Sequence, residues 1–365
     1  MRKIVTVIGA RPQFIKASAV SRALHSSGRL AEVLIHTGQH FDSNMSEVFF
    51  SELAMPTPKY NLGVHGGQHG AMTGQMLEGI ERILIDENPD AVLVYGDTNS
   101  TLAGTLAAVK LHIPVAHVEA GLRSFNMRMP EEINRILTDR ISTWLFTPTV
   151  AAVKHLRSEG VASDKIIAVG DVMYDVALHF SSQVAETGGA LSRLGLSSGR
   201  YVLATVHRAE NTGDAARLEV IVAALSDAAR KLPMVWPLHP RTRGVLQRHD
   251  LLDKLAASGV RLIEPVGYLE MVQLEKYAAL VVTDSGGVQK EAYFFQVPCV
   301  TMRDETEWVE LVEAGWNRLA PPDDPETVTA AILDALGTRG REVSPYGSGD
   351  AADKIVARLT ADLGN

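Results

Sequence analysis

The stretch V-A-H-V-E-A-G-L-R-S-F-N-M-R-M-P-E-E-I-N-R, residues 115–135, indicates the fold of this chain. Its first residues are apolar and predict a strand that ends near Val118. Pro130 can begin a helix, because the fixed φ of proline suits the first helical position. A strand, a loop and a helix in this order make up half of a parallel βαβ unit. The stretch therefore predicts an α/β fold, in which the loops that follow the strands bind ligands.

Short β-branched runs alternate with longer helical patterns along the rest of the chain. The predicted strands are 4–8, 33–36, 91–95, 115–118, 144–147, 166–169, 201–205, 234–238, 261–263, 280–283 and 299–302. Most of these runs are almost continuously apolar, which is typical of parallel strands covered by helices on both faces. The sequence therefore predicts two Rossmann-like, doubly wound parallel-sheet domains that face a cleft.

The length of 365 residues also favours two domains, since it exceeds what one hydrophobic core usually supports. Serines and glycines between residues 181 and 199 break the helical pattern where the chain is expected to enter the second sheet. We predict an N-terminal domain at 1–170, joined by a C-terminal amphipathic helix at 350–365. The C-terminal domain, at 171–349, is expected to bind UDP.

Composition excludes several classes of protein. A net charge of −8 argues against a general nucleic-acid surface. The single cysteine, Cys299, lies in an apolar run and is expected to be a buried strand residue, which leaves no disulfide framework or cysteine-ligated zinc site. No apolar run approaches the roughly 18 residues that span a bilayer, and the amino-terminal run is too short for a signal peptide. We expect a cytoplasmic protein with neither a nucleic-acid nor a membrane partner.

Two loops concentrate carboxylates after predicted strands. Asp97 follows the run A-V-L-V-Y, and the opening stretch carries Glu119, Glu131 and Glu132 together with three arginines. Arginines can hold an anionic substrate beside a carboxylate that takes or gives a proton. A salt-bridged surface loop is the alternative for any single glutamate, but two such loops favour catalysis.

Two further loops have features of phosphate sites. The loop G-A-R-P-Q-F-I-K turns at Gly9 and places Arg11 and Lys16 near the amino end of a helix, where free N–H groups attract anions. The loop T-D-S-G-G-V-Q-K-E-A, residues 283–292, has no bulky side chain at Ser285, Gly286 and Gly287. It either caps a helix with Asp284 or Ser285, or binds a pyrophosphate, and we favour the second because Glu291 follows where a carboxylate can reach a ribose.

Histidines follow two strands of the second domain. His207 lies in T-V-H-R-A-E-N beside Arg208 and Asn211, and its ring can be charged or neutral near physiological pH. His239 lies in P-L-H-P-R and is the weaker candidate for catalysis. The sequence has neither a D-x-D pair nor H-E-x-x-H, so a catalytic metal is not expected.

Together these motifs resemble the non-hydrolysing UDP-N-acetylglucosamine 2-epimerases, relatives of the glycosyltransferase-B fold. The matching segments, which cover nearly the whole chain, are 9–16, 96–101, 117–123, 129–135, 207–211, 283–292 and 302–307. The resemblance implies an acid/base set of Asp97, Glu119, Glu131 and His207. It implies that the diphosphate, the sugar and the ribose are held by Arg11, Lys16, Ser285, Gly286, Gly287, Arg303 and Glu291. We also assign substrate binding to Arg123, Arg208, Asn211 and His239.

The resemblance also implies a reaction. Elimination of UDP across C1 and C2 of the sugar gives a 2-acetamidoglycal, which is reprotonated on its other face before UDP adds back. Such a path needs acids and bases on two faces of the sugar and a site that holds the departing diphosphate. It needs no NAD and no metal, so no cofactor is expected. The resemblance further implies a homodimer, domain motion during catalysis, and a role in surface polysaccharide synthesis.

Several segments depart from the usual pattern of the family. Gln13 stands where a glutamate is usual, the acidic loop has the short form S-F-N-M-R-M-P-E-E, and E-T-E-W-V-E replaces an E-R-P-E-type stretch. Residues 39–45, Q-H-F-D-S-N-M, lack the arginine of Q-H-R-E, which puts in doubt a second UDP-N-acetylglucosamine site that activates some members.

The departures resemble a branch that acts on UDP-2,3-diacetamido-2,3-dideoxyglucuronate. Arg128 suits the carboxylate of such a sugar, although an arginine in this loop can instead pair with a neighbouring glutamate. The substrate is thus a UDP-N-acetylglucosamine-type sugar or this diacetamido uronate. A hydrolysing epimerase, a glycosyltransferase and a nucleotide-sugar sensor are more distant alternatives, and the paired acidic loops favour chemistry on the sugar itself.

Overall fold

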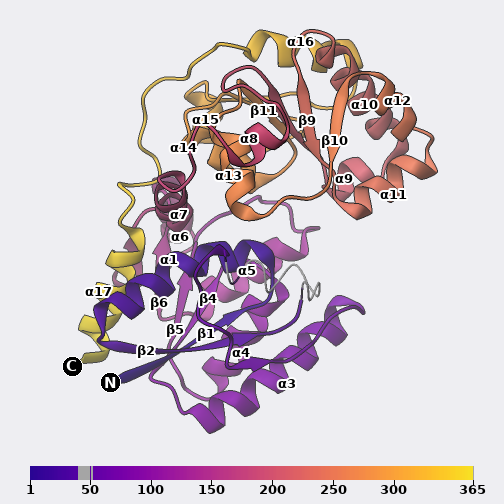
Figure 1. The fold of residues 1–365 in the computed structure, drawn as a ribbon. Helices are drawn as coiled ribbons and strands as arrows, with labels where there is room; N and C mark the ends of the chain where they lie inside the picture. Colours follow the sequence, from indigo (N-terminus) through magenta and orange to yellow (C-terminus); the bar gives the residue numbers. More distant parts are fainter. Residues whose placement is uncertain (40–49, 51, 365) are drawn as a thin grey trace. The chain divides into compact units, whose positions relative to one another are not determined.

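The computed structural model describes residues 1–39, 50 and 52–364. The chain divides into two compact units, Met1–Val176 with Ser344–Asn365, and Ala177–Val343 (Figure 1). Each unit has its own parallel sheet. Among the described residues, no helix combines the length and the apolar character needed to cross a membrane.

Unit 1 contains the first seven strands. Its strands are β1 (Arg2–Ile8), β2 (Leu30–His36), β3 (Tyr60–Asn61), β4 (Ala91–Tyr95), β5 (Val115–Val118), β6 (Trp144–Thr147) and β7 (Ile166–Ala168). Its helices are α1 (Arg11–Ser27), α3 (His69–Glu87), α4 (Asn99–Lys110), α5 (Pro130–Ile141), α6 (Val150–Ser158), the 3-10 turn η1 (Ser163–Lys165) and the final helix α17 (Ala351–Gly364). Helix α7 (Val172–Ser181) contains the boundary between the units.

The sheet of unit 1 has the order β3-β2-β1-β4-β5-β6-β7, and all of its pairs are parallel. The chain adds strands on one side of β1 first and then continues on the other side with β4. The gap between the loops that follow β1 and β4 is therefore a topological switch point, the place where open α/β sheets bind ligands.

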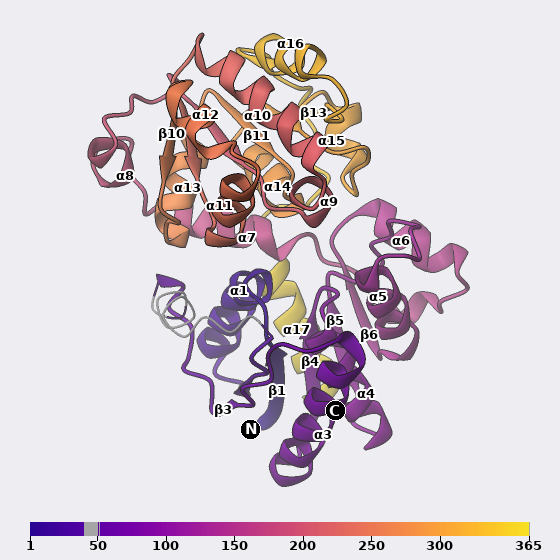
Figure 2. The ribbon, with the colours of Figure 1, turned by 90° about the vertical axis from the view of Figure 1, so that its right-hand side faces the viewer.

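Helices α3 and α4 pack against each other over one face of this sheet (Figure 2). Met76, Ile80 and Leu84 of α3 and the alanines of α4 pack on Val5 and Val94. Small residues on α4 let its backbone approach the sheet; Gly104, for example, faces Val7, whose atoms would lie 3.2 Å from an added Cβ. Right-handed crossovers place α1 on the opposite face.

The last helix returns to unit 1. Helix α17 packs beside α1 (Figure 1), Arg2 Nε donates to the carbonyl oxygen of Leu363 at 2.8 Å, and Trp144 Nε1 donates to Asp362 at 2.6 Å. Where the chain re-enters, the backbone N–H of Asp171 donates to the carbonyl of Tyr346 at 3.0 Å. Both ends of the described chain therefore belong to the same unit.

Unit 2 contains the other six strands. They are β8 (Val202–Thr205), β9 (Met234–Pro237), β10 (Val260–Ile263), β11 (Leu280–Thr283), β12 (Cys299–Thr301) and β13 (Asn317–Leu319), in the parallel order β10-β9-β8-β11-β12-β13. Its helices are α8 (Gly189–Arg193), α9 (Ala209–Thr212), α10 (Ala215–Ala229), α11 (Pro240–Arg248), α12 (Leu252–Ala257), α13 (Tyr268–Lys276), α14 (Gly286–Phe294), α15 (Val309–Glu313) and α16 (Pro325–Ala335). Its switch point lies between β8 and β11.

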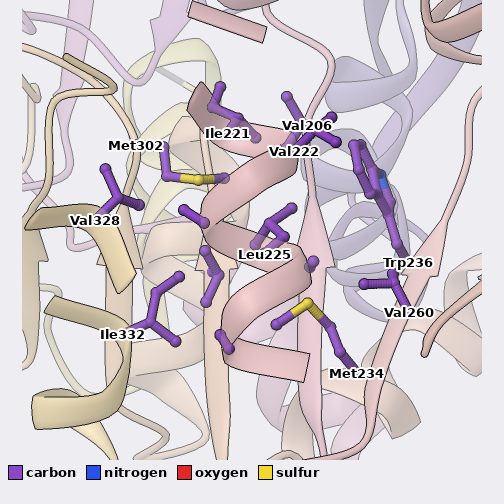
Figure 3. Close-up of a cluster of buried hydrophobic side chains, with 14 of the residues drawn as sticks. Val206, Ile221, Val222, Leu225, Met234, Trp236, Val260, Met302, Val328 and Ile332 are labelled. Carbon is purple, nitrogen blue, oxygen red and sulfur yellow. The ribbon is translucent and has the colours of Figure 1, made fainter. Parts of the chain in front are cut away.

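The core of unit 2 is centred on α10, which packs beside α16 on one face of the sheet. Figure 3 shows Ile221, Val222 and Leu225 of α10 among Trp236, Met302, Val328 and Ile332. A second cluster, built on α8, α13 and Cys299, covers the opposite face. The sheet is thus apolar on both sides, as the continuous hydrophobic runs predict.

The predicted α/β class, the two parallel sheets and the eleven predicted strands are confirmed, with differences of up to three residues at their ends. A helix begins at Pro130 as expected, and α1 begins at Arg11, one residue before the expected start around Pro12. Cys299 is a buried strand residue, as predicted. The sequence analysis missed β3 and β13. Both are edge strands of two or three residues, so neither leaves a recognisable apolar run.

One carboxyl at the return of the chain has a pH consequence. Asp175 of α7 accepts a hydrogen bond from the backbone N–H of Ala352 at 2.7 Å, at the start of α17. Burial, with smaller contributions from Asp171 and Asp350, raises the pKa of Asp175 from 3.8 to about 6. Because the raised pKa belongs to the folded state, the charged carboxylate destabilises the fold above about pH 6, and this penalty disappears as the pH falls towards 3.8.

We therefore predict that Asp175→Asn raises the thermal midpoint at pH 8 by a few degrees, which corresponds to of order 1 kcal/mol. The gain should stay constant from pH 8 to about pH 7 and then shrink as the pH is lowered through 6 to 5. Melting curves followed by circular dichroism across this range measure it. The exposed Asp353→Asn is the control and should show no such trend; a gain at Asp175 that does not vary with pH would contradict the prediction.

Candidate active site

Three neighbouring strands of unit 1 end in loops that carry the candidate residues. In the strand order β1, β4, β5, the loop after β1 leads to Lys16, the loop after β4 carries Asp97, and Glu119 follows β5. Parallel strands end at the same edge of a sheet, so these loops lie side by side. The structure thus brings Lys16, Asp97 and Glu119 to the switch point of unit 1.

Glu119 is held by a lysine and by an unusual backbone. Lys16 Nζ lies 2.5 Å from Glu119 Oε1, and both side chains are nearly buried. The φ of Glu119 is +71°, a left-handed value that costs free energy for a residue other than glycine and that clusters at functional sites. The backbone N–H groups of Glu119 and Ala120 both donate to the carbonyl of Phe146 at 3.1 Å, which fixes this conformation.

Asp97 is held by Arg135, which also binds a second carboxylate. Arg135 Nη2 lies 2.5 Å from Asp97 Oδ2, and Nη1 lies 2.9 Å from Glu132 Oε2. Glu132 is buried and also accepts hydrogen bonds from the backbone N–H groups of Ser124 and Phe125, at 3.0 and 2.9 Å. Glu132 therefore anchors the loop before α5 and, through Arg135, positions Asp97.

Glu131, which we predicted to be the acid/base residue of the Glu-Glu pair, is exposed at the start of α5. Its side chain forms no ion pair within the described residues. The carboxylate of Glu131 is therefore accessible to a ligand, whereas the carboxylate of Glu132 is bound by other residues of the fold.

Arg123 has a different environment from the one expected for a substrate-binding residue. Its guanidinium is buried and donates to Asp139 at 2.8 Å and to Glu159 at 2.7 Å. Burial lowers the pKa of Arg123, but Glu159 and Asp139 outweigh this effect and raise it. These contacts favour a structural role, in which Arg123 holds the loop of Glu119 against α5 and α6.

His117 completes this buried network. Its Nδ1 lies 2.7 Å from Asp139 and its Nε2 lies 2.7 Å from the carbonyl oxygen of Gly96. Each ring nitrogen thus lies within hydrogen-bond distance of a buried oxygen atom. His117 thereby fixes Gly96, the residue directly before Asp97.

The loop after β1 is constrained by close packing. A Cβ at Gly9 would lie 1.9 Å from Thr37 Oγ1, so only glycine fits. Gln13 accepts hydrogen bonds from the N–H groups of Gly9 and Ala10 and donates to the carbonyl of Tyr95 at 2.9 Å. An ionised glutamate could not make that donation, which explains why this chain can use glutamine here. Arg11 is half-buried at the first position of α1.

Unit 2 places its candidates at its own switch point. His207 and Arg208 follow β8, and Ser285, Gly286 and Gly287 follow the adjacent β11. Ser285 is the N-cap of α14, and the first turn of this helix contains no acidic residue. The free N–H groups of the turn and its positive dipole end form an environment for an anion.

Trp308 and Arg208 line the glycines of this loop. Trp308 Nε1 donates to the carbonyl of Gly286 at 2.9 Å. A Cβ at Gly286 would lie 3.5 Å from Trp308 Nε1 and 3.6 Å from Arg208 Nη2, so an arginine side chain lies directly beside the backbone of the loop. An arginine beside N-terminal N–H groups suits a diphosphate.

The other residues predicted to bind substrate fall into two groups. Glu291 is buried on α14, 3.2 Å from the hydroxyl of Tyr268, and His239 is exposed at the N-cap of α11. By contrast, Arg303 and Asn211 are buried within unit 2. Arg303 pairs with Glu210 at 3.1 Å and Glu307 at 3.0 Å. Asn211 donates to Asp284 and to the carbonyl of Met302. Both side chains are therefore held by partners within unit 2.

Sequence reasoning missed the residues that hold the site together. Within the described residues these are Glu132, Asp139, Glu159, Asp284, Glu307 and Trp308. Glu132 and Asp284 stood in the quoted motifs, but only burial distinguishes an anchoring carboxylate from a reactive one. No cluster of three or more metal-binding side chains is present in the described residues. The segment 40–45, on which the lost activator site depends, lies outside them.

A family model described as UDP-N-acetylglucosamine 2-epimerase matches residues 22–360. The chain is 55% identical, over 98% of its length and 99% of the relative, to a UDP-2,3-diacetamido-2,3-dideoxy-D-glucuronate 2-epimerase of Pseudomonas aeruginosa. It is 54% identical, over the same shares, to a UDP-N-acetylglucosamine 2-epimerase homolog of Methanococcus maripaludis.

A comparison with solved structures gives a match to the same kind of enzyme. The crystal structure of the UDP-GlcNAc 2-epimerase of Methanocaldococcus jannaschii, in complex with UDP-GlcNAc and UDP, matches with a TM-score of 0.91 at 44% identity, over 98% of this chain and 99% of that one. Because these matches cover nearly the whole sequence and its fold, the chain belongs to the UDP-N-acetylglucosamine 2-epimerase family and is an epimerase.

Proposed function

We propose that this chain inverts C2 of a UDP-2-acetamido sugar without hydrolysis, by elimination and re-addition of UDP. The observation that carries the proposal is the pair of carboxylates Asp97 and Glu119 at the switch point of unit 1, on adjacent strands and each held by a cation. Two positioned carboxylates can remove and return a proton. The nucleotide-sugar complexes of the related structures support the substrate class.

In the proposed reaction a base takes the C2 proton, the C1–O bond breaks, and UDP leaves with the bonding electrons. The resulting 2-acetamidoglycal is protonated at C2 from the opposite face, and a β-phosphate oxygen attacks C1 to restore the bond. Asp97, Glu119, Glu131 and His207 are the proposed acid/base set. Lys16 beside Glu119 favours the ionised carboxylate, the form that a general base requires.

The nucleotide is proposed to bind unit 2. Gly286 and Gly287 supply N–H groups and Ser285 its hydroxyl to the diphosphate, because the Ser285 N–H donates to Thr283 Oγ1. Arg208 adds a cation beside Gly286, and Glu291 binds the ribose. No step calls for a cofactor or metal. A UDP-sugar is also a charged substrate that does not leave water readily, which supports the expected cytoplasmic location.

For the sugar, we propose the diacetamido uronate. Arg128, exposed in the loop that Glu132 anchors, forms no ion pair in the part of the chain that the structure describes. Its guanidinium is therefore not used by a neighbouring glutamate and suits the C6 carboxylate of a uronate. The 55% identical relative is named for this substrate, while relatives at 54%, 44% and 42% identity are named for UDP-N-acetylglucosamine, so the exposed guanidinium carries this choice.

We also propose a homodimer, as the family resemblance implies. Ile133 and Leu137, four residues apart on one face of α5, are 41% and 45% exposed. If this face forms the interface, Leu137→Glu should convert the dimer into a monomer in sedimentation equilibrium. Val309→Glu, on an exposed apolar residue of α15, is the control and should leave the mass unchanged. A wild-type monomer would contradict the dimer, and a dimeric Leu137→Glu would contradict the interface.

The next prediction concerns the proposed acid/base residues. Asp97→Asn, Glu119→Gln and Glu131→Gln should each lower kcat by about a hundredfold or more, the usual scale for a positioned acid or base. UDP should still bind, as calorimetric titration can show, because the proposed nucleotide loop lies in unit 2. Glu78→Gln, on an exposed carboxylate of α3 that pairs with Arg82, is the control. A variant of the three that retains near-normal turnover is not part of the acid/base set.

A further prediction concerns the preference of the enzyme between the two UDP-sugars. In one reaction containing both sugars, the enzyme should epimerise the diacetamido uronate with at least tenfold higher kcat/KM than UDP-N-acetylglucosamine, since an unpaired polar group in the site costs of order 1–3 kcal/mol. Arg128→Met should remove most of this preference, and Arg157→Met on α6 should not. NMR in heavy water follows epimerisation and deuterium uptake at C2. Preference for UDP-N-acetylglucosamine, with a sigmoidal dependence on its concentration, would refute both the uronate and the lost activator site.

A further inference from the structure

Asp284 joins the two loops at the switch point of unit 2. It follows β11 directly and is the residue before the Ser-Gly-Gly segment. Its carboxylate is fully buried, and within the described residues no lysine or arginine pairs with it. Instead it accepts hydrogen bonds from the backbone N–H groups of His207 at 3.1 Å and Arg208 at 3.0 Å, and from Asn211 Nδ2 at 3.1 Å.

The same carboxylate faces the ring of His207. His207 Nδ1 lies 3.6 Å from Asp284 Oδ1, while 51% of the histidine side chain is exposed. The distance is somewhat longer than a hydrogen bond. Such contacts are often long in sites without substrate and shorten when it binds. The ring therefore has one nitrogen turned towards a buried negative charge and the other, Nε2, on the opposite side.

We propose that Asp284 is the positioning residue for His207. It favours the form of the ring that carries hydrogen on Nδ1, so that Nε2 is the nitrogen that exchanges a proton with the sugar or its leaving group. The inference deepens the proposed function, on which it rests for the acid/base role of His207. Asp284 thus becomes a further residue of the site, and its action is to set the tautomer of His207.

Asp284 also links this action to the nucleotide. Because Asp284 directly precedes Ser285, a displacement of Ser285 on diphosphate binding would also displace the carboxylate that holds the N–H groups of His207 and Arg208. Binding of the leaving group and orientation of the acid/base residue are thus coupled through one side chain. A carboxylate that only capped the loop would hold these N–H groups without setting the ring tautomer.

The proposed action needs the negative charge of Asp284 and two oxygens that accept hydrogen bonds, because the groups around this carboxylate are donors. In Asp284→Asn one oxygen becomes an NH2 group, which places a donor against the N–H groups that the carboxylate accepted and removes the charge that attracts Nδ1–H. Neutral histidine in solution carries its hydrogen mainly on Nε2, so the ring should return to that form.

The tautomer is measured directly with the full chain labelled at histidine nitrogens, in the presence of UDP. Long-range proton–nitrogen NMR distinguishes the two tautomers, and His207→Gln identifies the signal. We expect Nδ1–H in the wild type and Nε2–H in Asp284→Asn. Nε2–H in the wild type would overturn the proposal whether or not the variant folds. Because this readout needs no turnover, it stands apart from a failure of the proposed epimerase activity.

Kinetics provide the second readout. Asp284→Asn should lower kcat at least about tenfold while KM changes by less than about threefold, and the double variant with His207→Gln should be no slower than His207→Gln alone. Asp324→Asn, at the cap of α16, is the control for a general loss of stability. Losses that simply multiply in the double variant would overturn the proposal, since Asp284 would then act independently of His207.

Discussion

A buried carboxylate needs hydrogen-bond donors, and this requirement organises the loops at the switch point of each unit. In unit 1 the donors are cations: Lys16 for Glu119, and Arg135 for Asp97 and Glu132 together. In unit 2, Asp284 instead accepts N–H groups of the loop after β8. The two solutions have different effects. In unit 1 the carboxylates are held by charged side chains of other elements, whereas in unit 2 the carboxylate itself holds the backbone of a neighbouring loop in place.

The fold could be predicted largely from the sequence, because strands that are covered on both faces consist of continuous runs of apolar residues. The short edge strands β3 and β13 could not, since two or three residues carry no periodicity. Among the loops, the sequence located the residues that follow β4, β5, β8 and β11 correctly. It could not separate Glu131 from Glu132, because only the packing of α5 turns the second inward.

The same limit applies to arginines. Arg123 and Arg128 stand in one loop and are chemically identical, yet Arg123 is buried between two carboxylates and Arg128 is exposed. Which arginine can reach a ligand depends on Asp139 and Glu159, which lie 16 and 36 residues further along the chain. Asp139 lies on α5 and Glu159 directly follows α6, so no local sequence pattern predicts that they pair with Arg123. Motifs therefore identify the loops of an active site better than they identify the roles of individual residues.

The return of the chain to its first unit has a consequence for synthesis on the ribosome. Unit 2 is a continuous segment, Ala177–Val343, inserted between two parts of unit 1, and Asp171 and Tyr346 meet where the chain leaves and re-enters. Domains generally fold as units during translation. Unit 2 can therefore complete its core while unit 1 still lacks α17, the helix that covers α1. Until α17 emerges, the surface of α1 that it covers stays open to water or to a chaperone, so unit 1 is completed only after unit 2 has been made.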